Sequence, residues 1–133
     1  MRQIVFPIVV RTNCNRDDIL AFRHPLAGLQ LVKGGVELGE TPDQAAVREL
    51  REESGVHCRA AHLLETVPAD DSGPMWHLVL CETAPLPAHW IHRCLDDGGH
   101  DFAFFWHKLS SQLTYEWHPT FHKAMAYVRA RLL

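Results

Sequence analysis

The sequence predicts an α/β or α+β sandwich that forms one domain over residues 1–133. The chain has 133 residues, 47% of them hydrophobic, which is enough for one core and leaves no room for a second domain. Short runs of β-branched and aliphatic residues recur along it. Two amphipathic segments with helix start signals lie among and after these runs.

Three strands are expected in the first third of the chain. Residues 3–10 and 19–22 are aliphatic runs on either side of the turn-rich segment TNCNRDD, so we expect them to pair as a hairpin. Residues 29–32 form a third short strand that ends at Gly34 and Gly35.

The strongest helix signal covers residues 42–54. Thr41 is the expected N-cap, Pro42 occupies the first helical position, and Gln44 completes a capping box. Gly55 is the expected stop.

The second half alternates between strands and less regular segments. Strands are predicted at residues 58–66, 75–82 and 101–106. Residues 83–100, rich in Pro, His and Gly, are expected to form a long loop, and a final amphipathic helix is predicted at 119–132.

Composition excludes several function classes. The net charge is −3 and the basic residues are scattered, so nucleic acid is an unlikely partner. No apolar run approaches the length of a membrane span, and the start MRQIVFPIVV is too short and too strand-like for a signal peptide. We expect a soluble cytoplasmic protein with reduced thiols, because no CxxC pair occurs among Cys14, Cys58, Cys81 and Cys94.

Three carboxylates crowd one side of the predicted helix. Glu49, Glu52 and Glu53 are spaced three and four residues apart, so they project in similar directions. Like charges at i,i+4 cost an isolated helix roughly 0.2–0.5 kcal/mol. A divalent cation reverses the sign of that term, because Mg²⁺ is a hard ion held by carboxylates together with substrate phosphates.

The alternative is a solvated helix face in which neighbouring arginines soften the repulsion. The upstream residues argue against it. The segment from Gly34 to Val56 fits the pattern G-x5-E-x7-R-E-U-x-E-E-x-G-U, where U is a bulky aliphatic residue. Chance agreement at every defined position is expected on the order of once in 10⁹ windows. The matching positions are Gly34, Glu40, Arg48, Glu49, Leu50, Glu52, Glu53, Gly55 and Val56.

This segment resembles the Nudix box, and the order of strands and helices around it is similar to the Nudix α/β/α sandwich with a central mixed β-sheet. The resemblance implies hydrolysis of a nucleoside diphosphate linked to another group, with Mg²⁺ or Mn²⁺ and water as the nucleophile. It implies metal binding by Glu49, Glu52, Glu53 and the carbonyl of Gly34.

The resemblance also assigns supporting roles. It implies that Arg48 and Glu40 form an ion pair that holds the carboxylates in register. It also implies that Arg48 takes part in catalysis together with the three glutamates. A carboxylate inside or outside the box would deprotonate the water. Asp101 is one candidate base, and the choice stays open.

Substrate contacts are expected from residues outside the metal cluster. Arg23 lies where many Nudix sequences carry a phosphate-binding arginine, although an ordinary surface arginine is an equal alternative. Lys33 stands directly before Gly34 and Gly35, where many Nudix sequences have a proline, and its side chain could reach a distal phosphate. Trp90, in the predicted loop, is a candidate stacking residue, with a purely structural aromatic as the alternative.

Other functions remain open at this stage. His118 and His122 are four apart and could bind zinc, but surface histidines are the favoured interpretation because no further ligand completes the site. A non-catalytic nucleotide sensor would not need every box carboxylate. A docking role for the last helix competes with ordinary packing of its apolar stripe. We expect a small nucleotide substrate, most readily a nucleoside triphosphate. The sequence leaves the oligomeric state open, with a homodimer the commonest assembly by base rate.

Overall fold

The computed structural model describes residues 2–13 and 16–133 of the chain. Strands and two α-helices alternate along the described residues, which confirms the predicted α/β class. The chain divides into two compact units, one made of Met1–Val9 and Val32–Leu86, the other of Val10–Leu31 and Pro87–Leu133.

The first unit contains a mixed sheet with the strand order β5-β1-β7-β6. The neighbours β1 and β7 run parallel, while β5 and β6 pair antiparallel with β1 and β7 respectively. The strand bounds are Gln3–Ile8 for β1, Gly34–Gly35 for β5, Ala60–Pro68 for β6 and Met75–Glu82 for β7.

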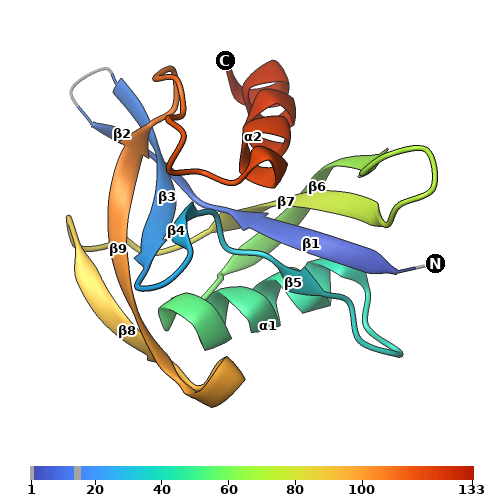
Figure 1. Cartoon of the computed structure of the whole chain (residues 1–133), viewed down its shortest axis with the longest axis horizontal. Helices are drawn as coiled ribbons and strands as arrows, with labels where there is room; N and C mark the ends of the chain where they lie inside the picture. Colours follow the sequence, from blue (N-terminus) through green and yellow to red (C-terminus); the bar gives the residue numbers. More distant parts are fainter. Residues whose placement is uncertain (1, 14–15) are drawn as a thin grey trace. The chain divides into compact units, whose positions relative to one another are not determined.

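Helix α1, Pro42–Ser54, belongs to the same unit and contacts β1, β5, β6 and β7 (Figure 1). It has the predicted bounds because its local signals are complete. Thr41 accepts a hydrogen bond from the backbone of Gln44, whose side chain accepts one from the backbone of Thr41. Gly55 ends the helix at φ 77°, in the left-handed region that glycine tolerates.

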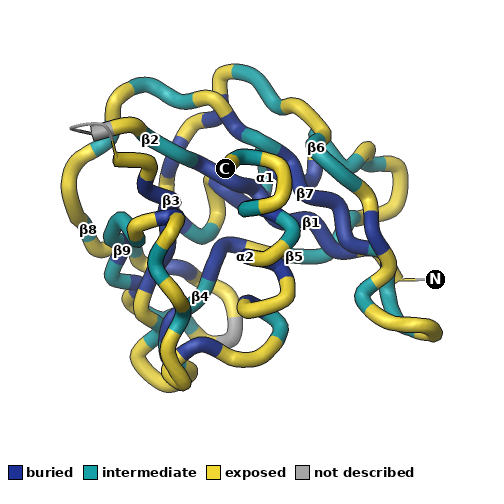
Figure 2. The backbone as a smooth tube through the Cα atoms, turned by 90° about the horizontal axis from the view of Figure 1, so that it is seen from above, coloured by how far each residue is buried: buried dark blue, intermediate teal, exposed yellow. Residues whose placement is uncertain are grey.

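The predicted hairpin between residues 3–10 and 19–22 is wrong for most of its first strand. Strand β1 pairs with β7 and β5, and only β2, Val10–Asn13, pairs with β3, Arg16–His24. Every residue from position 4 to position 9 is buried (Figure 2). Such a continuous buried run is typical of a strand with a parallel neighbour, and it has no signature that distinguishes a local partner from a distant one.

The second unit contains an antiparallel sheet with the order β2-β3-β9-β8, and β4 pairs with β3. Strands β4, β8 and β9 cover Gly28–Gln30, Trp90–Cys94 and His100–Lys108. The loop predicted over residues 83–100 therefore contains a strand and a short 3-10 helix, Asp96–Gly98. The sequence WIHRC alternates in burial along β8, but five residues beside Pro and Gly give a weak strand signal.

Helix α2, Pro119–Leu132, matches the predicted helix, and the side chain of His118 caps it by accepting from the backbone of Thr120. Phe121, Met125 and Val128 are buried, so the apolar stripe packs within the molecule. This favours packing over the docking role. Neither α1 nor α2 is long and apolar enough to cross a membrane, as judged over the described residues.

The cysteines are part of the packing. Cys58, Cys81 and Cys94 are buried free thiols. Burial raises the pKa of the Cys81 thiol, and the neighbouring Cys58 adds to that effect. Both features fit the predicted reduced state, and Cys14 lies outside the described residues.

Candidate active site

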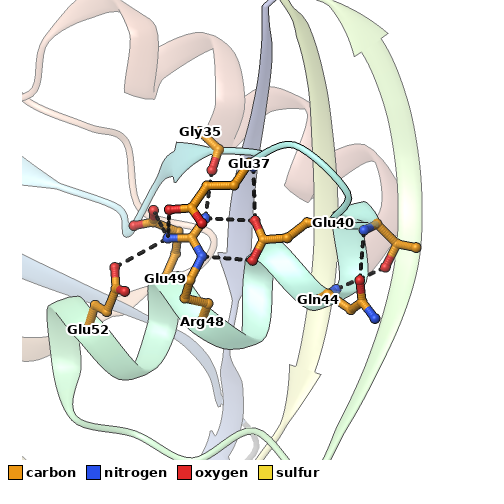
Figure 3. Close-up of polar contacts among 8 residues, drawn as sticks. Gly35, Glu37, Glu40, Gln44, Arg48, Glu49 and Glu52 are labelled. Atoms are coloured by element: carbon orange, nitrogen blue, oxygen red, sulfur yellow. Dashed lines mark hydrogen bonds and ion pairs between the residues drawn. The ribbon is translucent and has the colours of Figure 1, made fainter.

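The Nudix-like residues come together in the first unit, where β5 leads through a loop into α1. Figure 3 shows Glu37, Glu40, Glu49 and Glu52 arranged around the guanidinium of Arg48. The loop delivers Glu37 and Glu40, and successive turns of α1 deliver the rest. The helix therefore brings Glu49 and Glu52, two of the three carboxylates predicted to share a face, to one guanidinium.

Arg48 uses each nitrogen of its guanidinium. Nε and Nη2 donate to the two carboxylate oxygens of Glu40 at 2.8 and 2.9 Å. Nη2 also donates to the carbonyl oxygen of Gly35 at 2.8 Å, and Nη1 donates to Glu49 at 2.7 Å and to Glu52 at 3.3 Å. This fork geometry is specific to arginine, so a lysine cannot reproduce the set.

The Arg48–Glu40 pair matches the predicted supporting ion pair in its contacts. The hydrogen bond from Arg48 lowers the pKa of Glu40 to about 2, although burial acts in the opposite direction. In the other direction, the bond to Glu40 raises the pKa of Arg48. Only 16% of the Arg48 side chain and 19% of the Glu40 side chain are exposed, so solvent screens this pair less than a surface pair.

Glu49 is the most enclosed of the three helix carboxylates. It is buried, and burial raises its pKa, while hydrogen bonds with Arg48 and Glu53 act in the opposite direction. Glu52 adds negative charge nearby, which also raises the pKa of Glu49.

Gly34 provides the space that the Glu49 carboxyl occupies. A Cβ built on Gly34 would lie 2.0 Å from Cδ of Glu49 and 2.3 Å from each of its oxygens. A Cβ on the adjacent Gly35 would meet nothing within 4 Å. The first glycine is therefore required by the carboxylate packed against it, which is a stricter demand than a turn makes.

The donor set suits a hard divalent cation, because it consists of carboxylate oxygens beside backbone carbonyls. Glu49 packs closely against Gly34, so the two residues predicted to supply a side-chain and a backbone ligand are neighbours. Within residues 2–13 and 16–133, however, no group of three or more His, Cys, Asp or Glu side chains is arranged to hold a metal. Arg48 instead engages Glu49 and Glu52, so the metal assignment remains a prediction.

The other defined positions of the motif serve the fold. Leu50 and Val56 are buried at 0% and 6% exposure. Ser54 donates to the carbonyl of Leu50 and accepts from the backbone of Val56, which ties the last turn of α1 to the residues after it. These contacts and the left-handed Gly55 keep the helix end in place beneath the charged cluster.

Lys33 lies directly before the site and is exposed. Partial burial of its ammonium group and the positive charge of Arg2 lower the pKa of Lys33, and Glu53 opposes that change. The positive charge of Lys33 thus lies within electrostatic reach of one predicted metal ligand. Its expected contact with a substrate phosphate stays a prediction.

Arg23, Trp90 and Asp101 belong to the second unit. Arg23 forms a salt bridge with Glu116 at 3.1 Å, and Trp90 lies on a strand, where its ring stacks on Phe104 at 5.1 Å. Asp101 pairs with Arg93 at 3.2 Å. Each has a structural partner, and their roles toward a substrate or a water stay predictions.

The predicted surface histidines also have local partners. His118 caps α2, and the ring of His122 hydrogen-bonds with the carbonyl of Thr114 at 3.0 Å. Each histidine thus makes a local contact that stabilises the fold, as expected for surface histidines.

Sequence reasoning missed two members of the cluster. Glu37 lies 3.7 Å from Nη1 of Arg48, and the carbonyl of Gly35 accepts from Nη2. Both occupy undefined positions of the motif. The signal for Glu37 was a carboxylate three residues before Glu40, and the two are joined through backbone and side-chain hydrogen bonds.

A surface hollow adjoins this loop. It has a volume of about 420 Å³ and is lined by Arg2, Gln3 and residues 35–40. Glu37 and Glu40 therefore contribute both to the wall of the hollow and to the cluster around Arg48.

The fold is that of a Nudix pyrophosphohydrolase. The NUDIX domain model matches residues 1–126, so the chain belongs to the NUDIX family. The family hydrolyses nucleoside diphosphate derivatives and generally uses divalent metal ions, and the predicted family and enzyme class are confirmed. No match was found among curated protein sequences.

Solved structures share the fold over nearly the whole chain. A structure from work on the MutT proteins of Aliivibrio salmonicida and Vibrio cholerae has a TM-score of 0.69 at 21% identity, covering 98% of both chains. The NUDIX domain of Shewanella oneidensis NrtR in complex with ADP ribose scores 0.65 at 17% identity, covering 98% of this chain and 88% of the other. The Caenorhabditis elegans Ap4A hydrolase scores 0.64 at 16% identity, covering 100% and 99%.

Proposed function

We propose that the chain hydrolyses a phosphoanhydride bond of a small nucleotide, most readily a nucleoside triphosphate, by water attack at phosphorus with Mg²⁺ or Mn²⁺ bound. The observation that carries the proposal is the cluster of four carboxylates around Arg48, with Glu49 seated against Gly34. A purely structural helix has no need of so much negative charge at one place.

In this proposal Glu49, Glu52, Glu53 and the carbonyl of Gly34 hold the metal. When bound, the ion neutralises phosphate charge and favours in-line attack by water. Arg48 and Glu40 act as positioning residues, because their bidentate pair fixes the guanidinium to which Glu49 and Glu52 are bound.

The substrate side of the proposal rests on charge and aromatic character. Lys33 supplies a cation next to the site, and Arg23 and Trp90 are proposed to contact phosphate and base. Structures with this fold include a MutT, an Ap4A hydrolase and an ADP-ribose complex, so the substrate panel must span all three chemistries.

The experiment measures release of phosphate, pyrophosphate or a nucleoside monophosphate from nucleoside triphosphates, ADP-ribose and dinucleoside polyphosphates. Each substrate is assayed with Mg²⁺, with Mn²⁺ and with EDTA. Glu53→Gln tests the metal ligand, and Glu82→Gln is the matched control because Glu82 is exposed and pairs with His62.

We expect cation-dependent turnover of at least one substrate, which Glu53→Gln abolishes and Glu82→Gln preserves. The Glu53→Gln protein should be as stable as wild type or slightly more stable without metal, because the amide removes one of two like charges at i,i+4, those of Glu49 and Glu53. Nucleotide binding that raises the melting temperature without any turnover would contradict the proposal and favour a sensor.

A further inference from the structure

One nitrogen of Arg48 is shared by three carboxylates. Nη1 lies 2.7 Å from Glu49, 3.3 Å from Glu52 and 3.7 Å from Glu37. The other two nitrogens are occupied by Glu40 and by the carbonyl of Gly35. The carboxylates therefore compete for Nη1 only, and Glu49 lies closest to it, Glu52 next and Glu37 farthest.

This sharing conflicts with the proposed metal site. Glu52 is a proposed metal ligand, yet its carboxylate accepts a hydrogen bond from Arg48. Turning that carboxylate toward a metal removes an acceptor from a guanidinium whose side chain is only 16% exposed. A largely buried cation that loses a partner raises the free energy of the metal-bound state unless another acceptor replaces it.

Glu37 has the properties of that replacement. Its carboxylate is already in ion-pair contact with the same nitrogen, and 67% of its side chain is exposed, so its movement is not restricted by packing. It also lines the hollow of about 420 Å³ beside the loop, which leaves space for rotamer changes. Its backbone is held in place by hydrogen bonds with Glu40 in both directions.

We propose that Glu37 is the exchange partner of Arg48. When Glu52 leaves Nη1 for the metal, Glu37 closes from 3.7 Å to hydrogen-bonding distance and takes the place of Glu52 at that nitrogen. Glu37 is thus a positioning residue that lowers the free energy of metal binding without touching the metal. The inference rests on the proposed function, because it requires that Glu52 be a metal ligand.

The test is a double-mutant cycle on metal affinity, with Glu37→Gln and Glu52→Gln alone and together. Mn²⁺ binding is measured by water-proton relaxation, which covers affinities down to the millimolar range. Glu82→Gln again controls for the loss of one negative charge at an exposed site. Urea unfolding in EDTA checks that Glu37→Gln leaves the metal-free fold intact.

Glu37→Gln should weaken Mn²⁺ binding by about two- to five-fold, the range set by one exposed ion pair. The Glu82→Gln control should bind like wild type. In the Glu52→Gln background the additional effect of Glu37→Gln should disappear, because Glu52, the carboxylate that Glu37 is proposed to replace at Nη1, is then absent.

Two results would overturn the exchange. Equal Mn²⁺ affinity of wild type and Glu37→Gln would show that Arg48 needs no replacement partner. The same fold-loss in both backgrounds would show that Glu37 acts through its charge alone. Absence of Mn²⁺ binding by wild type would instead refute the proposed function and the exchange with it, so the two failures are distinguishable.

Discussion

Replacing Gly34 by alanine should damage the site while leaving the backbone conformation allowed. The new Cβ would lie 2.0 Å from Cδ of Glu49, a distance at which one group must move. The carboxyl is the end of a flexible side chain, so it yields before the backbone does. The expected consequence is a Glu49 carboxyl displaced from its seat, with its 2.7 Å hydrogen bond to Arg48 lost or weakened.

The cost can be estimated from that bond. A hydrogen bond between charged groups contributes about 1.5–3 kcal/mol, and the side chains of Glu49 and Arg48 are only 11% and 16% exposed. Replacing glycine by alanine stabilises by about 0.4–1 kcal/mol through the unfolded state. Gly34→Ala should therefore lower the free energy of unfolding by about 1–2 kcal/mol.

Gly35→Ala is the matched control, because a Cβ there meets nothing within 4 Å. Gly35 also lies outside the positive-φ glycines, so alanine should be neutral or slightly stabilising. Urea unfolding of the three proteins in EDTA gives the stabilities, and Mn²⁺ titration gives the metal affinities. If Gly34→Ala and Gly35→Ala behave alike in both assays, the argument that Glu49 needs the space at Gly34 is refuted.

Three further predictions concern the supports of the cluster. Arg48→Lys should cost about 2–3 kcal/mol, because an ammonium cannot make the bidentate contact with Glu40 and still reach Gly35 and Glu49; equal stability by urea unfolding would contradict this. The pKa of Glu40 is lowered to about 2 in the folded state, so its contribution to stability is present above the unfolded value near 4.5 and is lost as pH falls toward 2. Between pH 6 and pH 2.5 the free energy of unfolding of Glu40→Gln should therefore fall less steeply than that of wild type, and Glu82→Gln should keep the wild-type slope. Gly55→Ala should cost about 1 kcal/mol because of its left-handed φ of 77°, and a melting temperature equal to that of wild type would exclude strain at this cap.

The sequence predicted best where the signals are local. Helix α1 was predicted with its observed bounds because Thr41, Gln44 and Gly55 each act within a few residues of the helix ends. The pairing of β1 was wrong because its partner β7 lies about seventy residues away, and burial on both faces gives no clue to partner identity. Strand β8 was missed because WIHRC is short and follows a segment rich in Pro and His.

The motif predicted most residues of the cluster around Arg48, and the structure shows that its other positions support the fold. Leu50, Val56 and Gly55 hold the helix in place, and Gly34 makes room for a carboxylate. Glu37 escaped the sequence reasoning because its contact with Arg48 depends on the path of the loop, and a spacing rule for helices does not describe loops.

The arrangement of the cluster shows how far Arg48 offsets the negative charge gathered at this helix. One guanidinium faces four carboxylates, those of Glu37, Glu40, Glu49 and Glu52, so Arg48 reduces the repulsion but leaves an excess of negative charge. The raised pKa of Glu49 is the expected response, because a buried carboxyl beside other carboxylates favours the protonated form. A divalent cation would offset that excess. Without metal, the free energy of unfolding should therefore depend on pH and on Arg48, because of the same charges that would bind the metal.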